Sequence, residues 1–89
     1  MRQEFANYLI GRGYKLTTPS GSFSTVYDYI KRIDKVCDWE GCDWKTLAEN
    51  IVVIVPKYDV GGVKADYGDI SHRAVINALK RFKEFVQSR

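Results

Sequence analysis

The sequence predicts an all-α protein folded as a compact bundle of four helices. Apolar residues recur at three- and four-residue spacing in four separate segments, the pattern of helices that each bury one face. Stretches rich in Gly, Pro, Ser and Thr lie between segments and are typical of loops. With 89 residues and a hydrophobic fraction of 45%, the chain fits one globular domain, residues 1–89.

The four helices are expected near residues 2–12, 23–37, 44–58 and 71–87. The residues on their core stripes are Phe5, Tyr8 and Leu9; Val26, Ile30, Ile33 and Cys37; Leu47, Ile51, Ile54, Val55 and Tyr58; and Val75, Leu79, Phe82 and Val86. Helix-capping side chains are offered by Ser22 or Ser24, Asp43 and Ser71. The oxygen of each can accept a hydrogen bond from an amide of the first turn, which has no partner inside its own helix.

The stretch "IVVIVP", residues 51–56, could form either a strand or a helix, because its β-branched residues run together. A helix is preferred, since the apolar residues of 47–58 share one helical face and a single strand would have no partner in the chain. Pro56 should then end or kink this helix. The glycine-rich stretch "YDVGGVKADYGDI" has no helical stripe and is expected to be a long connection.

Charge is distributed unevenly along the chain. Residues 38–50 carry a net charge of −3, whereas residues 71–89 carry +4. Such a separation gives the electric field a direction and favours a polyanionic partner more than the overall charge of +3 suggests.

The composition also predicts several absences. Cys37 and Cys42, with His72 as the single histidine, cannot supply a four-ligand zinc set without carboxylates, so no metal or other cofactor is expected. The two cysteines are expected to be reduced thiols. No apolar run reaches the length of a membrane span and no signal segment opens the chain, which favours a soluble, cytoplasmic protein with no membrane partner.

The second and last helices share a pattern at an offset of 49 residues. Identical residues at that offset are Ser22 and Ser71, Val26 and Val75, Lys31 and Lys80, and Arg32 and Arg81. Each Lys-Arg pair therefore stands at the same angle from the core stripe of its own helix. This equivalence predicts that both pairs lie on one surface of the folded protein.

Three stretches resemble the N-terminal core-binding domain of tyrosine recombinases, the phage-type integrases. "STVYDYIKRIDKVC" is similar to the opening of that domain's second helix, with Ser22, Thr25, Val26 and Tyr29 at matching places. "SHRAVINALKRFKEFV" resembles its last helix and "FANYLIGRGY" its first. The chain departs from the pattern at Ala74, where the family often has Thr, in the longer stretch "GGVKADYGD", and at Pro56.

The resemblance implies a four-helix SAM-like fold that clamps double-stranded DNA, with its second and last helices facing the major groove. In that family, site-specific DNA recombination and integration also require a C-terminal catalytic domain, which would be a further partner. The catalytic set of a tyrosine nucleophile with arginines, a lysine and histidines is missing from this chain, and His72-Arg73 lacks the family's His-x-x-Arg spacing. The chain by itself is therefore not expected to be an enzyme.

The candidate DNA-binding residues are Ser24, Thr25, Lys31, Arg32, Lys35, His72, Arg73, Asn77, Lys80 and Arg81. The lysines and arginines would neutralise phosphates, and the others could donate hydrogen bonds to phosphates or bases near the helix starts. The alternative is a helical protein-protein interaction module that does not bind DNA. In that case Tyr27, Trp39, Trp44 and Ile76 would form an exposed patch, and the basic residues would serve only solubility.

Overall fold

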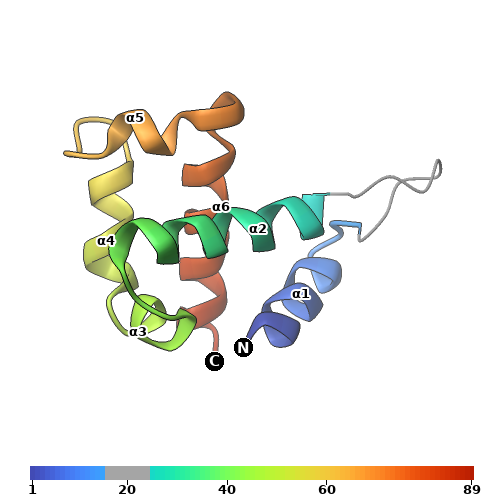
Figure 1. The fold of residues 1–89 in the computed structure, drawn as a ribbon. Helices are drawn as coiled ribbons and strands as arrows, with labels where there is room; N and C mark the ends of the chain where they lie inside the picture. The colour runs from blue at the N-terminus through green and yellow to red at the C-terminus, as the bar shows by residue number, and fades with distance from the viewer. Residues whose placement is uncertain (16–24) are drawn as a thin grey trace.

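The computed structural model describes residues 1–15 and 25–89 of the chain, and this part is helical without any strand (Figure 1). Its six helices are α1 (Arg2–Gly11), α2 (Thr25–Glu40), α3 (Trp44–Glu49), α4 (Ile51–Tyr58), α5 (Ala65–Gly68) and α6 (Ile70–Gln87). The all-α prediction is confirmed. The expected caps Ser22 and Ser24 and the expected helix start at residue 23 lie outside the described residues.

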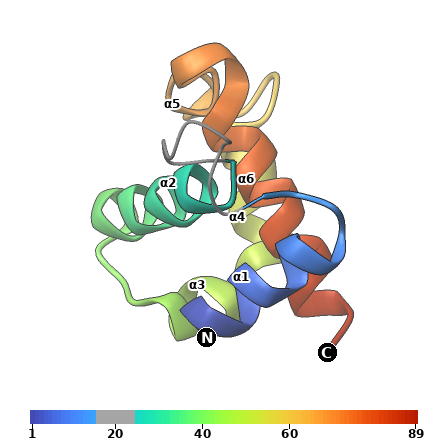
Figure 2. The ribbon, with the colours of Figure 1, turned by 90° about the vertical axis from the view of Figure 1, so that its right-hand side faces the viewer.

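Helix α6 is the centre of the bundle. It packs against α1, α2, α3, α4 and α5. In Figure 1, α2 crosses α6, and α4 stands beside it. Figures 1 and 2 show both chain termini at one end of the molecule and α5 at the other.

The buried face of α6 is broader than the predicted stripe. Val75, Leu79 and Phe82 are fully buried as expected, but Phe85 is also buried while Val86 is only half-buried. The extra buried area follows from the position of α6, because neighbours on several sides cover more than one stripe of a central helix. At its C-terminal half, the Phe82 ring meets Phe5 edge-on with 5.2 Å between ring centroids.

The predicted single helix over residues 44–58 is wrong, because Asn50 divides it into α3 and α4. The backbone of Asn50 departs from helical geometry (φ −113°, ψ 15°), and its side-chain amide donates to the Thr46 carbonyl at 2.9 Å. A short polar side chain that bonds to nearby backbone competes with the helix in this way. Asp43 caps α3 as predicted, accepting a hydrogen bond of 2.8 Å from the Thr46 amide.

The choice of helix over strand for residues 51–55 is confirmed. Pro56 does not end the helix at the preceding residue, since α4 continues to Tyr58. The ring of Pro56 has no N–H to donate to the Val52 carbonyl and crowds that carbonyl, and α4 ends two residues later.

The stretch expected to be a connection is instead packed against the end of α4 and contains the short helix α5. The Lys64 amide donates to the Lys57 carbonyl at 2.7 Å. An added Cβ at Gly62 would lie 2.2 Å from the Pro56 carbonyl oxygen, and one at Gly68 would lie 1.9 Å from that of Tyr58. Both glycines are therefore needed for the backbone to approach α4 this closely.

The predicted N-cap at Ser71 is also wrong. Ser71, His72 and Arg73 have positive φ angles of 56°, 57° and 69°, so they form a left-handed turn, called here the 71–73 turn, inside the span of α6. Side chains other than glycine are disfavoured in this conformation by about 1 to 2 kcal/mol per residue. The hydroxyl of Ser71 accepts a hydrogen bond from Arg32 of α2 instead of capping the helix.

Candidate nucleic-acid interface

Two exposed lysines lie one helical turn apart on the outer side of α2. Helix α2 buries Val26, Ile33 and Val36, which turns Lys31 and Lys35 toward solvent. These lysines line a cavity of about 270 Å³, called here the α2 basic cavity, whose walls are Asp28, Lys31, Arg32, Lys35, Trp39 and Ile70. Three cations and one carboxylate give this cavity a positive balance.

Arg32 connects α2 to the 71–73 turn. Its guanidinium donates to the Ser71 hydroxyl at 3.0 Å and forms an ion pair with Asp28 at 3.3 Å. Its Nε atom is buried and finds no acceptor among the described residues. Arg32 therefore holds the turn beside the lysines of α2, and it is not a fully solvated cation. His72 is exposed in this turn.

Trp39 supports the α2 basic cavity from inside the fold. Its ring stacks on Tyr58 at 6.1 Å and contacts Tyr67 at 4.8 Å between centroids. The Lys35 ammonium lies 6.0 Å from the centroid of the Trp39 ring, a cation–π arrangement. Because other side chains pack on this ring, it is not an open platform for stacking a base.

The predicted DNA-binding residues of α6 have different partners. Arg73 and Lys80 both form ion pairs with Asp59, at 3.6 and 3.5 Å. Asn77, which lies between these two residues in the sequence, is exposed. Arg81 forms an ion pair with Glu84 at 2.8 Å, and its Nε atom is buried without an acceptor in the described part of the chain, as that of Arg32 is.

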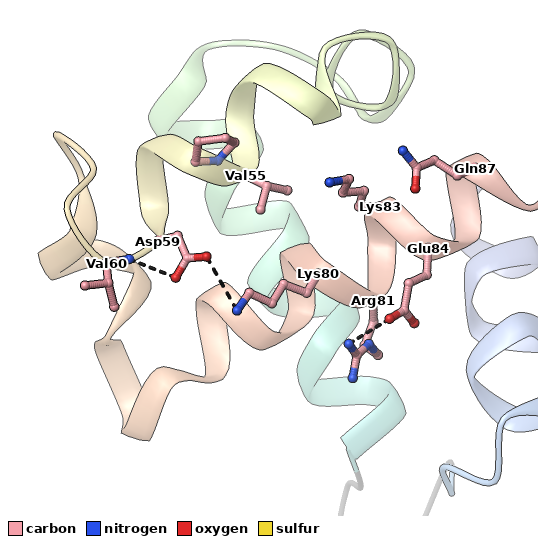
Figure 3. A pocket seen from close by; sticks show the side chains of 9 residues that line it. Val55, Asp59, Val60, Lys80, Arg81, Lys83, Glu84 and Gln87 are labelled. Atoms are coloured by element: carbon pink, nitrogen blue, oxygen red, sulfur yellow. Dashed lines mark hydrogen bonds and ion pairs between the residues drawn. The ribbon is translucent and has the colours of Figure 1, made fainter.

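Lys80 and Arg81 line a second cavity, of about 550 Å³, between α4 and α6 (Figure 3). This second cavity, called here the α4–α6 groove, shares no lining residue with the α2 basic cavity. Each Lys-Arg pair therefore lines a cavity of its own, and the prediction that both pairs lie on one surface stays a prediction. The repeat fixes each pair relative to the core stripe of its own helix, whereas the crossing of α2 over α6 decides the flank on which it lies.

Of the remaining predicted residues, Thr25 is exposed as the first residue of α2, and Ser24 lies outside the described residues. The structure thus brings Lys31, Arg32 and Lys35 together beside the 71–73 turn. Lys80 and Arg81 line the other cavity.

Two members of the alternative interaction patch, Ile76 and Trp44, are less exposed than that alternative requires. Ile76 is fully buried in the core. Trp44 is half-buried, with its ring 5.4 Å from that of Phe82 and its indole N–H donating to Asp34 at 2.7 Å. Exposed apolar side chains include Val52, Val53 and Val60 in or after α4. Tyr67 and Ile70, near Trp39, are exposed as well.

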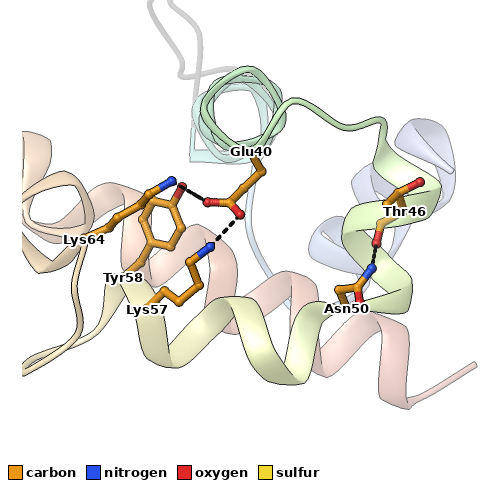
Figure 4. A network of polar contacts seen from close by, with 6 residues as sticks. All are labelled: Glu40, Thr46, Asn50, Lys57, Tyr58 and Lys64. Carbon is orange, nitrogen blue, oxygen red and sulfur yellow. Dashed lines mark hydrogen bonds and ion pairs between the residues drawn. The ribbon is translucent and has the colours of Figure 1, made fainter.

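Sequence reasoning missed the polar network around Glu40, the last residue of α2 (Figure 4). Its carboxylate accepts hydrogen bonds from Lys57 and Lys64 at 2.8 Å and from the Tyr58 hydroxyl at 2.7 Å. Burial acts to raise the pKa of Glu40, but these hydrogen bonds outweigh it and lower the pKa to about 2. In the sequence, only the acidic stretch around Glu40 pointed to this network. Its hydrogen-bond donors come from segments that follow later in the chain.

Cys37, in the last turn of α2, and Cys42, two residues after that helix, are free thiols. Burial, followed by the proximity of Cys42, raises the pKa of Cys37 to about 12. Burial also raises the pKa of Cys42, more than its hydrogen bond with Cys37 lowers it. In residues 1–15 and 25–89, no group of three His, Cys, Asp or Glu side chains is placed to hold a metal ion.

No family model, curated protein or solved structure matches the chain. In the part of the chain that the structure describes, no helix combines the length and apolar character that a bilayer span requires.

Proposed function

We propose that the chain is a DNA-binding domain that holds duplex DNA through the α2 basic cavity and the adjoining 71–73 turn. The resemblance to the core-binding domain of tyrosine recombinases supports this proposal. The observation that carries it is the placement of Lys31 and Lys35 one turn apart and exposed, next to an arginine that fixes the turn carrying His72. The expected DNA contacts from the whole of α2 and α6 are reduced in this proposal to contacts from α2 and the start of α6.

The chemistry of this surface suits phosphate contacts. Lysines on the flank of a helix can neutralise phosphates of a duplex and release counterions without reading base sequence. His72 in the turn could donate to a phosphate beside them. About three phosphate contacts would give a slope near −2.7 in a plot of log affinity against log salt concentration.

Duplex DNA is favoured over single strands because the aromatic side chain of the cavity is already packed. Proteins that bind single strands stack successive bases on open aromatic faces. Trp39 instead contacts Tyr58 and Tyr67 and lies beneath Lys35. In this proposal the domain positions DNA, and strand cleavage belongs to a separate catalytic domain of a recombinase.

The test is a charge reversal on α2. Lys31→Glu with Lys35→Glu should weaken binding to a random-sequence duplex at least tenfold, equivalent to about 1.4 kcal/mol. The control, Lys15→Glu with Lys45→Glu, makes the same charge change at two other exposed lysines and should weaken binding much less. Fluorescence anisotropy at several salt concentrations measures both the affinity and the salt slope.

The proposal fails if both double variants lose affinity equally, because binding would then follow net charge alone. It also fails if the unmodified chain does not bind duplex at low salt. Stronger binding to a single strand than to the duplex would contradict the assignment of Trp39 as a packed residue.

A further inference from the structure

The α4–α6 groove has one apolar wall and one basic wall. Val55 and Pro56 of α4 line one side, and Lys80, Lys83 and Gln87 of α6 line the other (Figure 3). Asp59 and Val60, directly after α4, also line it. As seen in Figure 3, α2 passes behind α6, so the groove opens away from that helix.

The apolar wall continues over the outer face of α4. Val52 and Val53 are 59% and 66% exposed, and Val60 is 77% exposed. Val52 and Pro56 share one side of the helix, because they stand at positions i and i+4. An exposed apolar strip beside a groove is typical of a protein-interaction site.

The basic wall carries charge that the fold does not neutralise. Lys83 forms no ion pair within the described residues, and Lys80 shares its one partner, Asp59, with Arg73. Glu84 is already engaged by Arg81 at 2.8 Å. A ligand that places carboxylates opposite Lys80 and Lys83 would therefore gain ion pairs without breaking a close one.

We propose that this groove binds an amphipathic helix of a partner protein that carries carboxylates beside an apolar stripe. The apolar side chains of the ligand would pack on Val55, Pro56 and Val60. Its carboxylates would pair with Lys80 and Lys83, which are three residues apart and thus one helical turn apart. A groove between two helices, apolar on one side and charged on the other, matches the helix-in-groove mode of recognition.

A nucleic acid fits this groove poorly, because one of its walls is apolar and Asp59 and Glu84 add negative charge. A second copy of the chain is also a poor occupant. Its acidic stretch is engaged within its own fold, where Glu40 is bound by two lysines and Asp43 caps α3.

The probe is a fluorescein-labelled helical peptide with leucines along one face and glutamates flanking them, beside a matched peptide in which every glutamate is lysine. The acidic peptide should bind the full chain at least tenfold more tightly than the basic one. Lys80→Glu with Lys83→Glu should reverse that preference. Lys31→Glu with Lys35→Glu should leave the preference for the acidic peptide unchanged. This result would distinguish the groove from the proposed DNA-binding surface.

Three further measurements test the interpretation of peptide binding. Circular dichroism must show that both double variants are folded, and the single variant Lys83→Ala, which removes charge without reversing it, should weaken acidic-peptide binding at least threefold. Amide chemical shifts on titration should move for Val55, Val60 and Lys83.

The proposal is overturned if neither peptide binds at about 1 mM, corresponding to about 4 kcal/mol. Equal binding of both peptides, shifts confined to other surfaces, or a dimer that Val53→Lys dissociates would also overturn it.

Discussion

The carboxylate of Glu40, at the end of α2, accepts a hydrogen bond of 2.7 Å from the hydroxyl of Tyr58, at the end of α4. Lys57 and Lys64 donate to the same carboxylate, which is only 10% exposed. A single acidic side chain thus joins α2, α4 and the segment leading into α5. The Tyr58 ring in turn stacks on Trp39, so the network also supports the α2 basic cavity from below.

Glu40→Gln should lower the free energy of unfolding by about 2 to 3 kcal/mol. The amide keeps the shape of the side chain but loses the negative charge, and hydrogen bonds to charged groups are worth about 1.5 to 3 kcal/mol. Urea unfolding followed by circular dichroism measures the change. Glu49→Gln, at an exposed position, is the control and should stay within about 0.5 kcal/mol.

The contribution of Glu40 should depend on pH in a defined direction. Its pKa in the folded protein is about 2, below the ordinary value of 4.5, so the folded state favours the ionised form. The stabilisation is therefore complete above about pH 4.5 and is lost as the pH falls toward 2. The difference in unfolding free energy between the unmodified chain and Glu40→Gln should shrink over that interval. A difference that stays constant from pH 6 to pH 2.5 would show that the carboxylate is not stabilised as described.

Glycine at position 72 should stabilise the protein. His72 has a φ angle of 57°, a region that glycine adopts without the steric penalty of a Cβ atom. His72→Gly should raise the free energy of unfolding by about 1 kcal/mol. The matched variant Asn77→Gly, at an exposed position in the regular part of α6, should lower it by several tenths of a kcal/mol. Changes of opposite sign in the free energy of unfolding, measured by thermal unfolding, would support the left-handed turn. Destabilisation by both variants would argue against it.

Phe82→Ala should cost about 3 to 5 kcal/mol of folding free energy. The side chain is fully buried and contacts the rings of Phe5 and Trp44, so its removal leaves a cavity in the core. Val63→Ala removes apolar atoms from a residue that is 88% exposed and should change stability by less than about 0.5 kcal/mol. Comparable losses in the two variants would mean that Phe82 is not a core residue.

The two thiols should differ in reactivity toward iodoacetamide. The thiolate is the nucleophile, and burial raises the pKa of Cys37 to about 12, whereas Cys42 is less buried. Peptide mass spectrometry at pH 8 should detect alkylation of Cys42 before that of Cys37. In urea the two rates should converge, because the protection comes from the fold. Faster modification of Cys37 in the folded protein would contradict its burial.

Local features of this protein were predictable from the sequence because they depend on neighbouring residues. The apolar spacing of three and four residues placed the helices and identified Phe82 as a core residue, since the direction of a side chain from a helix follows from its position along it. The cap at Asp43 was predictable because it bonds to an amide only three residues away. The division at Asn50 and the left-handed turn at residues 71–73 were missed, because competing backbone conformations at single positions leave no periodic pattern.

The candidate interface was predictable only in part. The sequence determined that Lys31 and Lys35 share one side of α2, but only the packing of α2 across α6 decided that Lys80 lies in a different cavity. The bond from Arg32 to Ser71 spans 39 residues, and those from Glu40 to Lys57 and Lys64 span 17 and 24. Contacts between such distant residues arise when whole helices dock, and the docking is set by the summed burial of their apolar faces. The sequence alone therefore determined the helices and the direction of each side chain from its own axis, and the tertiary structure decided which of those side chains meet.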